Sequence, residues 1–125
     1  HPYYAAIAHL RVSAHFLIRR DGGLLQFVPC CMRAWHAGES SWRGRARCND
    51  FSIGIEVEGA DDVPFADAQY ASLERLTALL LSTYPSISAI AGHEDIAPLR
   101  KSDPGPCFDW LRYRAGVVND VGFRA

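Results

Sequence analysis

The spacing of apolar and polar side chains predicts four short strands. Three stretches are rich in β-branched and aromatic residues, and the dipeptide Asp21-Gly22 favours a tight hairpin turn between the first two. A fourth, shorter stretch leads into Gly92. The predicted strands are residues 12–18, 24–28, 51–58 and 87–91.

A period of three to four residues predicts helices elsewhere. Residues 67–84 carry apolar side chains along one side, and Asp67 is placed to cap their start. Shorter helices are predicted over residues 2–10 and 108–114. A chain of 125 residues without an internal repeat or a linker makes one domain, so the pattern predicts a single α/β domain.

Two stretches follow neither period. Residues 29–50 contain two glycines, two tryptophans and four arginines. They are too long for a mere connection in a small domain, so we expect a functional loop there. Residues 94–107 are predicted to form a second loop, which is rich in proline.

Alternation within the strands sorts their side chains between two faces. In the third strand Ile53, Ile55 and Val57 share the face expected to pack in the core, and Glu56 points the other way. In the first strand His15 likewise lies opposite the apolar side chains. Small residues beside titratable groups are typical of the floor of a cleft. The alternative is that this face is simply solvated.

The composition argues against several classes of partner. With a net charge of −1, the chain lacks the positive excess that phosphate-driven nucleic-acid binding needs. The longest aliphatic stretch, residues 76–81, is far too short to cross a bilayer, so no membrane partner is expected. No signal peptide is expected, because no basic segment precedes an apolar run. The first residue is His1 rather than Met, which is consistent with a true N-terminus upstream.

The cysteines favour free thiols. None of the four forms a Cys-x-x-Cys pair, which disfavours a zinc ribbon, and their density is far below that of a disulfide scaffold. We therefore expect reduced cysteines and a reducing compartment. They are Cys30, Cys31, Cys48 and Cys107.

The densest chemical pattern lies in residues 92–106. His93 follows a predicted strand, Asp103 comes ten residues later, and Lys101 is the only lysine in the chain. Three prolines restrict this loop. A histidine nitrogen and an aspartate oxygen both suit Zn²⁺. On spacing alone, one His and one Asp across a loop are also a common pattern, and Lys101 could equally be an ordinary surface residue.

Four segments of the sequence stand out together. They are residues 11–22 (RVSAHFLIRRDG), 34–38 (AWHAG), 48–59 (CNDFSIGIEVEG) and 92–106 (GHEDIAPLRKSDPGP). They resemble the AmpD family, over nearly the whole chain and in the same order. That family comprises zinc-dependent N-acetylmuramoyl-L-alanine amidases specific for 1,6-anhydromuramoyl peptides, within a wider group that includes phage amidases and peptidoglycan-recognition proteins. The resemblance implies a mixed central β-sheet flanked by helices.

The resemblance also implies a role for individual residues. His93 and Asp103 match two of three zinc ligands, Glu56 matches the acid that handles the proton of the attacking water, and Lys101 matches the cation that stabilises the oxyanion. Further positions match residues that face the substrate, or that lie in the cleft or behind its ligands. The substrate-facing positions are Arg11, Trp35 and Arg47, and the other two are His15 and His36.

One departure from the family pattern concerns its first zinc ligand. That ligand is a histidine on an N-terminal strand, in an Ile-His-Asn-like context that this chain lacks. We therefore expect residues 1–125 to be an amidase domain whose N-terminal strand is missing. Such a piece would bind zinc poorly, because two protein ligands hold the ion more weakly than three.

The function expected from the resemblance is zinc-dependent hydrolysis of the amide between (1,6-anhydro-)N-acetylmuramic acid and L-alanine, in peptidoglycan recycling. The substrate would be a small muropeptide, and the enzyme a cytoplasmic monomer. The main alternative is a non-catalytic muropeptide-binding module, as in recognition proteins that have lost zinc ligands. A serine hydrolase is disfavoured because no Gly-x-Ser-x-Gly elbow occurs, and no cysteine has a nearby nucleophile motif.

Overall fold

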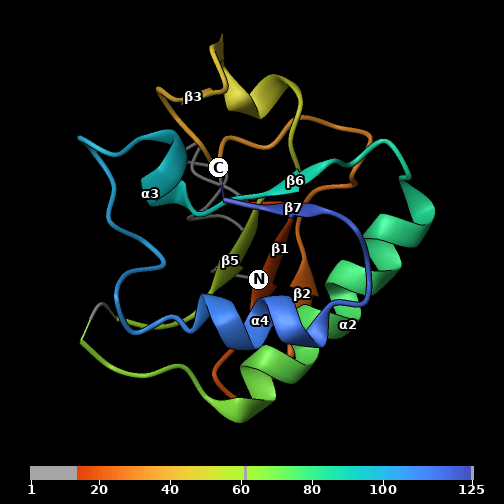
Figure 1. The fold of residues 1–125 in the computed structure, drawn as a ribbon, viewed down its shortest axis with the longest axis vertical. Helices are drawn as coiled ribbons and strands as arrows, with labels where there is room; N and C mark the ends of the chain where they lie inside the picture. The colour runs from red at the N-terminus through yellow and green to blue at the C-terminus, as the bar shows by residue number, and fades with distance from the viewer. Residues whose placement is uncertain (1–13, 61, 125) are drawn as a thin grey trace.

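A computed structural model describes residues 14–60 and 62–124. Its central sheet has three strands in the order β2-β1-β5 (Figure 1). Strand β1 (Phe16–Ile18) pairs antiparallel with β2 (Leu24–Gln26) and parallel with β5 (Ile55–Val57). The sheet is therefore mixed, as expected, and the hairpin at Asp21-Gly22 is confirmed, with Gly22 at a φ of 86° that favours glycine.

Two smaller ladders lie outside this sheet. Strands β3 (Ser41–Trp42) and β4 (Arg45–Ala46) form a short hairpin inside the predicted loop of residues 29–50, called the long loop below. A 3₁₀ turn, η1 (Cys48–Asp50), follows the hairpin. Strand β6 (Ala89–Ile90) pairs parallel with β7 (Gly122–Phe123), close to the end of the chain. The sequence pattern predicted β6 but none of β3, β4 and β7.

Three helices are described. The longest, α2 (Asp67–Thr83), begins where the side chain of Gln69 accepts a hydrogen bond from the Ala66 amide at 2.9 Å. The prediction that Asp67 caps this helix is wrong, because Ala66 is the N-cap and Asp67 is the first helical residue. Helix α4 (Trp110–Gly116) begins at Asp109, whose carboxylate accepts from the Arg112 amide at 3.0 Å. The third, α3 (His93–Ile96), is a single turn where the sequence predicted a loop from residue 94 onward. The helix predicted over residues 2–10 lies outside the described residues. No helix of the described segments is both long and apolar enough to cross a membrane.

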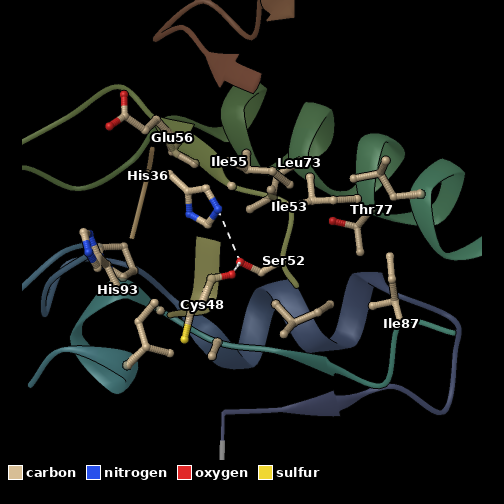
Figure 2. Close-up of a pocket in the computed structure, with 18 of the residues that line it drawn as sticks. His36, Cys48, Ser52, Ile53, Ile55, Glu56, Leu73, Thr77, Ile87 and His93 are labelled. Carbon is tan, nitrogen blue, oxygen red and sulfur yellow. Dashed lines mark hydrogen bonds between the residues drawn. The ribbon is translucent and has the colours of Figure 1, made fainter. Parts of the chain in front are cut away.

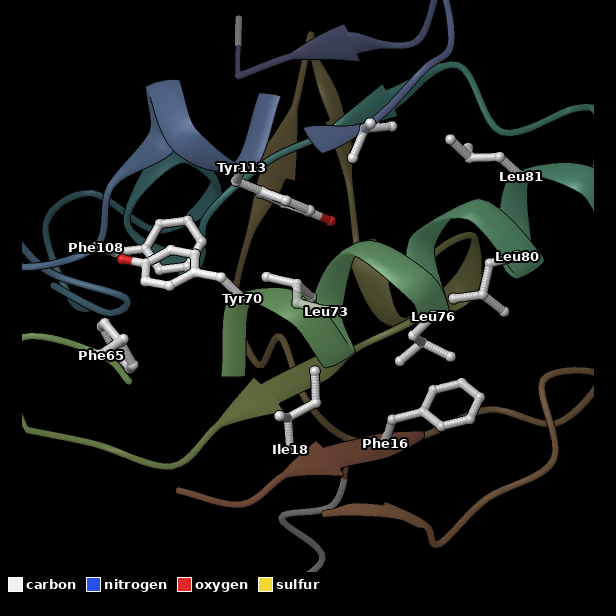
Figure 3. Close-up of a cluster of buried hydrophobic side chains, with 11 residues drawn as sticks. Phe16, Ile18, Phe65, Tyr70, Leu73, Leu76, Leu80, Leu81, Phe108 and Tyr113 are labelled. Atoms are coloured by element: carbon white, nitrogen blue, oxygen red, sulfur yellow. The ribbon is translucent and has the colours of Figure 1, made fainter. Parts of the chain in front are cut away.

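The core lies between the sheet and α2, and it continues from α2 to α4 (Figure 3). Phe16 and Ile18 from β1 meet leucines on one side of α2. The predicted core side of residues 51–58 is confirmed, since Ile53, Ile55 and Val57 pack against this cluster. Alternation therefore turns Glu56 away from the core.

A large cavity opens beside the sheet. It measures about 1730 Å³ and is lined by residues of β5, of β6 and of the inner side of α2. Within the described part of the chain, β5 is an edge strand, and β6 pairs only with β7. Trp110 also lines this cavity, and its indole Nε1 is the one buried side-chain polar atom of the described residues without a hydrogen-bond partner. Among the described residues, this cavity therefore separates the central sheet from the β6–β7 ladder.

Candidate functional site

A smaller hollow of about 490 Å³ collects most of the predicted site residues. It lies where β5, the long loop and the segment that follows β6 meet. Figure 2 shows Glu56, His36 and His93 gathered at one side of the adjoining pocket, with the apolar side chains of Leu73 and Ile87 at the other. Six of the nine predicted residues line the hollow: Trp35, His36, Glu56, His93, Lys101 and Asp103.

His93 and Asp103 converge in this hollow. His93 opens α3, and its Nδ1 lies 3.3 Å from an Asp103 carboxylate oxygen. The Glu94 amide donates a hydrogen bond of 2.9 Å to the Asp103 carbonyl, which joins the start of α3 to the segment that carries Asp103. The hydrogen bond to Asp103 raises the pKa of His93, and the same bond lowers the pKa of Asp103.

The orientation of the His93 ring suits a metal ligand. Its Nε2 donates to the carbonyl oxygen of Ala37 at 2.9 Å, so Nδ1 carries the second proton in the imidazolium that hydrogen-bonds Asp103, and a lone pair for a metal in the neutral ring. One imidazole nitrogen and one carboxylate oxygen fit Zn²⁺. Among the described residues, no third His, Cys, Asp or Glu joins them as a ligand. The donor set present is therefore chemically right for zinc and one protein ligand short of a three-ligand site.

The Ala37 carbonyl accepts hydrogen bonds from both His93 and Arg100, which the sequence pattern did not predict. Arg100 donates to this oxygen at 2.6 Å and to the Glu39 carbonyl at 2.8 Å. The amide of Ala37 in turn donates to the buried side chain of Asn49 at 2.8 Å. Arg100 and Asn49 thereby hold the backbone atom that orients the His93 ring. The proximity of Arg100 to Lys101 in the sequence was the only available signal for this role.

Glu56 is the carboxylate best placed for proton transfer. It projects from β5 toward the hollow and remains accessible to solvent. Loss of solvating water raises its pKa, and the nearby charge of Asp103 raises it further. His93 and Lys101 act in the opposite direction, because positive charge favours the carboxylate. A carboxylate with a raised pKa is the better base near neutral pH.

Lys101 lines the same hollow from the segment that follows α3. Its amide donates to the Ala97 carbonyl at 2.8 Å, so the backbone there continues as a turn rather than an open loop. The side chain is exposed and contributes electrostatically to Glu56, His93 and Asp103. A cation in this position can stabilise negative charge that develops on a substrate oxygen.

His36 packs directly against Gly54, the residue before β5. A side chain on Gly54 would overlap the His36 ring, since an added Cβ would lie 2.3 Å from the ring carbon Cγ. The ring nitrogen Nε2 lies 3.3 Å from the Ser52 hydroxyl, which itself donates to the Cys48 carbonyl. Burial, with help from His15, lowers the pKa of His36 to about 4. The ring is therefore neutral at physiological pH.

His15 lies behind His36, with 5.7 Å between the ring centroids. Its side chain is almost completely buried, and both ring nitrogens are engaged. Nδ1 accepts from the Gly54 amide at 3.0 Å, while Nε2 donates to the Met32 carbonyl at 2.8 Å. His15 therefore fastens the long loop to β5 beneath the cleft and offers no free nitrogen to a ligand.

The remaining predicted residues lie at the margin or beyond it. Trp35 is 46% exposed, and the guanidinium of Arg33 lies 4.2 Å from the centre of its ring. Arg47 is exposed, with a φ of 59° at the start of η1, and does not line the small hollow. Arg11 lies outside the described residues.

This arrangement suits hydrolysis of a polar substrate. A partly desolvated carboxylate, an exposed ammonium group and a His–Asp pair of metal-ligand type face one space. A base, an oxyanion-stabilising cation and a metal-binding pair are the components that an amide hydrolase of this class requires.

Comparison with protein families and known proteins agrees with this chemistry. Residues 1–106 match the family model described as N-acetylmuramoyl-L-alanine amidase. The chain is 62% identical over 119 residues to the 1,6-anhydro-N-acetylmuramyl-L-alanine amidase AmpD of Citrobacter freundii, covering 94% of this chain and 64% of that protein. It is 61% identical over 122 residues to the Escherichia coli K12 AmpD, covering 97% and 67%. This chain thus spans about two thirds of the length of these relatives.

Solved structures of amidases also superpose on this chain. A selenomethionine derivative of AmpD superposes with a TM-score of 0.82 at 60% identity, over 94% of this chain and 66% of the other. The amidase AmiD from E. coli superposes with a TM-score of 0.80 at 35% identity, over 96% and 53%. That structure is a complex with the substrate anhydro-N-acetylmuramic acid-L-Ala-D-gamma-Glu-L-Lys.

Proposed function

The chain belongs to the N-acetylmuramoyl-L-alanine amidase family, and from that premise we propose the reaction of the protein. It hydrolyses the amide between (1,6-anhydro-)N-acetylmuramic acid and L-alanine of small muropeptides, in peptidoglycan recycling. The observation that carries this proposal is the meeting of Glu56, Lys101, His93 and Asp103 in one hollow. The substrate complex of the AmiD relative supports the class of substrate.

The proposed cofactor is Zn²⁺, held by His93 through Nδ1 and by Asp103. Bound there, the ion would polarise the scissile carbonyl and lower the pKa of a water molecule. The hydrogen bond from Nε2 of His93 to the Ala37 carbonyl supports this role, because such a bond fixes the tautomer that a metal needs.

Glu56 and Lys101 carry the proton and charge transfers. Glu56 takes a proton from the attacking water and delivers it to the leaving amine of L-alanine. The raised pKa of Glu56 favours both proton transfers. Lys101 stabilises the oxyanion that forms on the muramoyl carbonyl oxygen. Both groups reach the hollow from different segments, so substrate bound between them meets a preformed charge pattern.

Binding would use Trp35 at the margin of the hollow and two arginines that the resemblance to the family assigns to the substrate. The exposed ring of Trp35 offers a flat apolar face to a sugar. The guanidinium groups of Arg47 and Arg11 suit the carboxylates of a stem peptide.

A third zinc ligand would come from a segment outside residues 1–125. In support, β5 is open along one edge in the described part of the chain, and a cavity of about 1730 Å³ separates it from β6. A further strand beside β5 would complete the sheet, and the cavity that it would enter is lined by His93 and Asp103. On this proposal residues 1–125 form most of an amidase domain, and the strand that carries the third ligand lies outside them.

Replacing Glu56 by Gln in the complete protein tests the proposed reaction. The change keeps the shape and removes the base, so we expect release of the stem peptide from anhydromuramoyl tripeptide to fall about 10²- to 10⁴-fold. Lys101→Met should lower turnover about 10²-fold through the oxyanion. Glu58→Gln is a matched control, because Glu58 lies two residues further along the same segment and does not line the small hollow. Near-normal turnover of the Glu56 variant would assign the base elsewhere.

The second candidate function is a muropeptide-binding module without catalysis. The observation in its favour is that the described residues supply only two ligands. Titration of the unmodified protein with anhydromuramoyl tripeptide separates the two functions, since a pure binder would hold the tripeptide intact. We place the amidase in the cytoplasm as a monomer, and fractionation and sedimentation are the direct tests.

A further inference from the structure

The C-terminal segment returns to the site from beyond the family match. The match to the family model ends at residue 106 of this chain, whereas β7 lies at Gly122–Phe123. The Gly122 amide donates to the Ser88 carbonyl at 3.0 Å, and the Arg124 amide donates to the Ile90 carbonyl at 2.6 Å. Strand β6 leads directly into Gly92 and His93. The last described residues therefore brace the strand that delivers His93.

The Arg124 side chain extends this brace onto α3. Its Nε lies 3.2 and 3.1 Å from the two carboxylate oxygens of Asp95, and its Nη2 lies 2.9 Å from one of them. The same Nη2 donates to Glu94 at 3.1 Å. The guanidinium also lies 4.8 Å from the centre of the Trp110 ring. One cation thus joins both acidic residues of α3 to α4.

Asp95 passes this constraint to His93. While one of its oxygens faces Arg124 alone, the other also accepts from the Gly92 amide at 2.7 Å. That bond closes the first turn of α3, whose first residue is His93. A helix of one turn has no cooperative stability of its own. Its geometry therefore depends on groups outside it.

We propose that Arg124 is a positioning residue for His93. Through Asp95 it holds the α3 turn in the orientation that directs Nδ1 of His93 toward Asp103. Without the guanidinium, Asp95 and Glu94 lose the charge-assisted hydrogen bonds that tie the turn to Arg124, and the turn would open more often. For metal binding the inference rests on the proposed function, whereas for the order of α3 it does not.

The test replaces Arg124 by Gln in the complete protein and follows two quantities. Amide hydrogen exchange, measured by nuclear magnetic resonance, reports opening of residues 92–95. Competition with a chelating indicator reports Zn²⁺ affinity. We expect exchange at these amides to accelerate about tenfold and the affinity to fall about tenfold, the lower end of the range for groups that orient metal ligands. Arg124→Lys should keep only part of the protection from exchange and part of the Zn²⁺ affinity, since lysine cannot make the forked contact.

Two comparisons separate positioning from general stabilisation. Arg112→Gln removes a similar arginine contact that does not involve α3. Arg112 of α4 pairs with Asp67 of α2 at 2.8 Å and lies 4.3 Å from the Tyr70 ring centre. It should leave both quantities unchanged. In an Asp95→Asn background, Arg124→Gln should add little, because the path runs through Asp95.

Three results would overturn the inference. They are unchanged exchange at residues 92–95, equal effects from the Arg112 variant, or acceleration spread evenly over α2 and the central sheet. If the unmodified protein binds no Zn²⁺, the proposed cofactor fails, and the exchange data alone still decide whether Arg124 orders α3.

Discussion

The regions around α2 and around α3 are held in place by different forces. Helix α2 runs for 17 residues and buries leucines between the sheet and α4. Helix α3 has four residues, none of them buried, and is fixed by hydrogen bonds and charges from distant segments. Apolar packing of α2 is shared among many contacts, whereas single polar groups set the orientation of α3. Substitutions should therefore act globally in the first region and locally in the second.

The largest contrast is expected within α2 itself. Leu76 is 4% exposed and Leu79 is 63% exposed, so the same truncation tests packing against solvent. Leu76→Ala should lower the free energy of unfolding by about 2–5 kcal/mol. Leu79→Ala should change it by less than about 0.5 kcal/mol. Denaturant titration measures both, and equal losses would mean that the packing assigned to α2 is wrong.

A smaller effect is expected from His36, which belongs to the cleft. Its folded-state pKa of about 4 lies below the ordinary 6.5, so the folded protein binds fewer protons than the unfolded chain. Stability should therefore fall as pH drops from 6.5 toward 4, by at most about 3 kcal/mol from this group. Unfolding curves of the His36→Gln variant should lack this component. An unchanged pH slope in that variant would show that another group causes it.

The smallest effect is expected from the His93–Asp103 pair in metal-free protein. The raised pKa of His93 gives stability that is present below 6.5 and lost as pH rises through its folded value. The lowered pKa of Asp103 gives stability that is present above 3.8 and lost as pH falls through its folded value. The pair thus stabilises most between these limits. Because the Asp103 side chain is 59% exposed, the gain should stay under about 1 kcal/mol.

Asp103→Asn with a chelator present measures this gain. The difference in unfolding free energy between variant and parent should peak near pH 5 and narrow on either side. A difference that grows steadily up to pH 8 would contradict the assigned window.

The difference between α2 and α3 also explains which elements could be predicted from the sequence. Helix α2 was predicted over residues 67–84 because periodic packing leaves a periodic pattern, and the face of Glu56 followed from strict alternation. Helix α3 was missed because one turn has no period, and its support from Arg124 is distant in the chain. The β3–β4 hairpin was missed because its turn places Arg43, not only a glycine, at a positive φ of 49°.

The site shows the same division. Residue type and the family resemblance brought His93, Lys101 and Asp103 together as candidates, and the structure places them around one hollow with Glu56. Arg100 could not be found in this way. Its partner is the carbonyl oxygen of Ala37, and a backbone atom carries no signature in a sequence. Nor does alternation reveal that the start of the long loop covers His15.

The attachment of His15 bears on how the cleft can change over evolution. Its main chain and ring together bind Phe27, Met32 and Gly54, so both ends of the long loop are fixed at one buried residue. Lengthening the stretch between these anchors would cost little free energy, about 0.6 kcal/mol for each doubling. Insertions at the exposed β3–β4 turn could therefore reshape this side of the cleft while the contact of Ala37 with Asn49 and the β1–β5 pairing stay intact. Loop length, rather than the sheet, is where this scaffold can diversify its substrates.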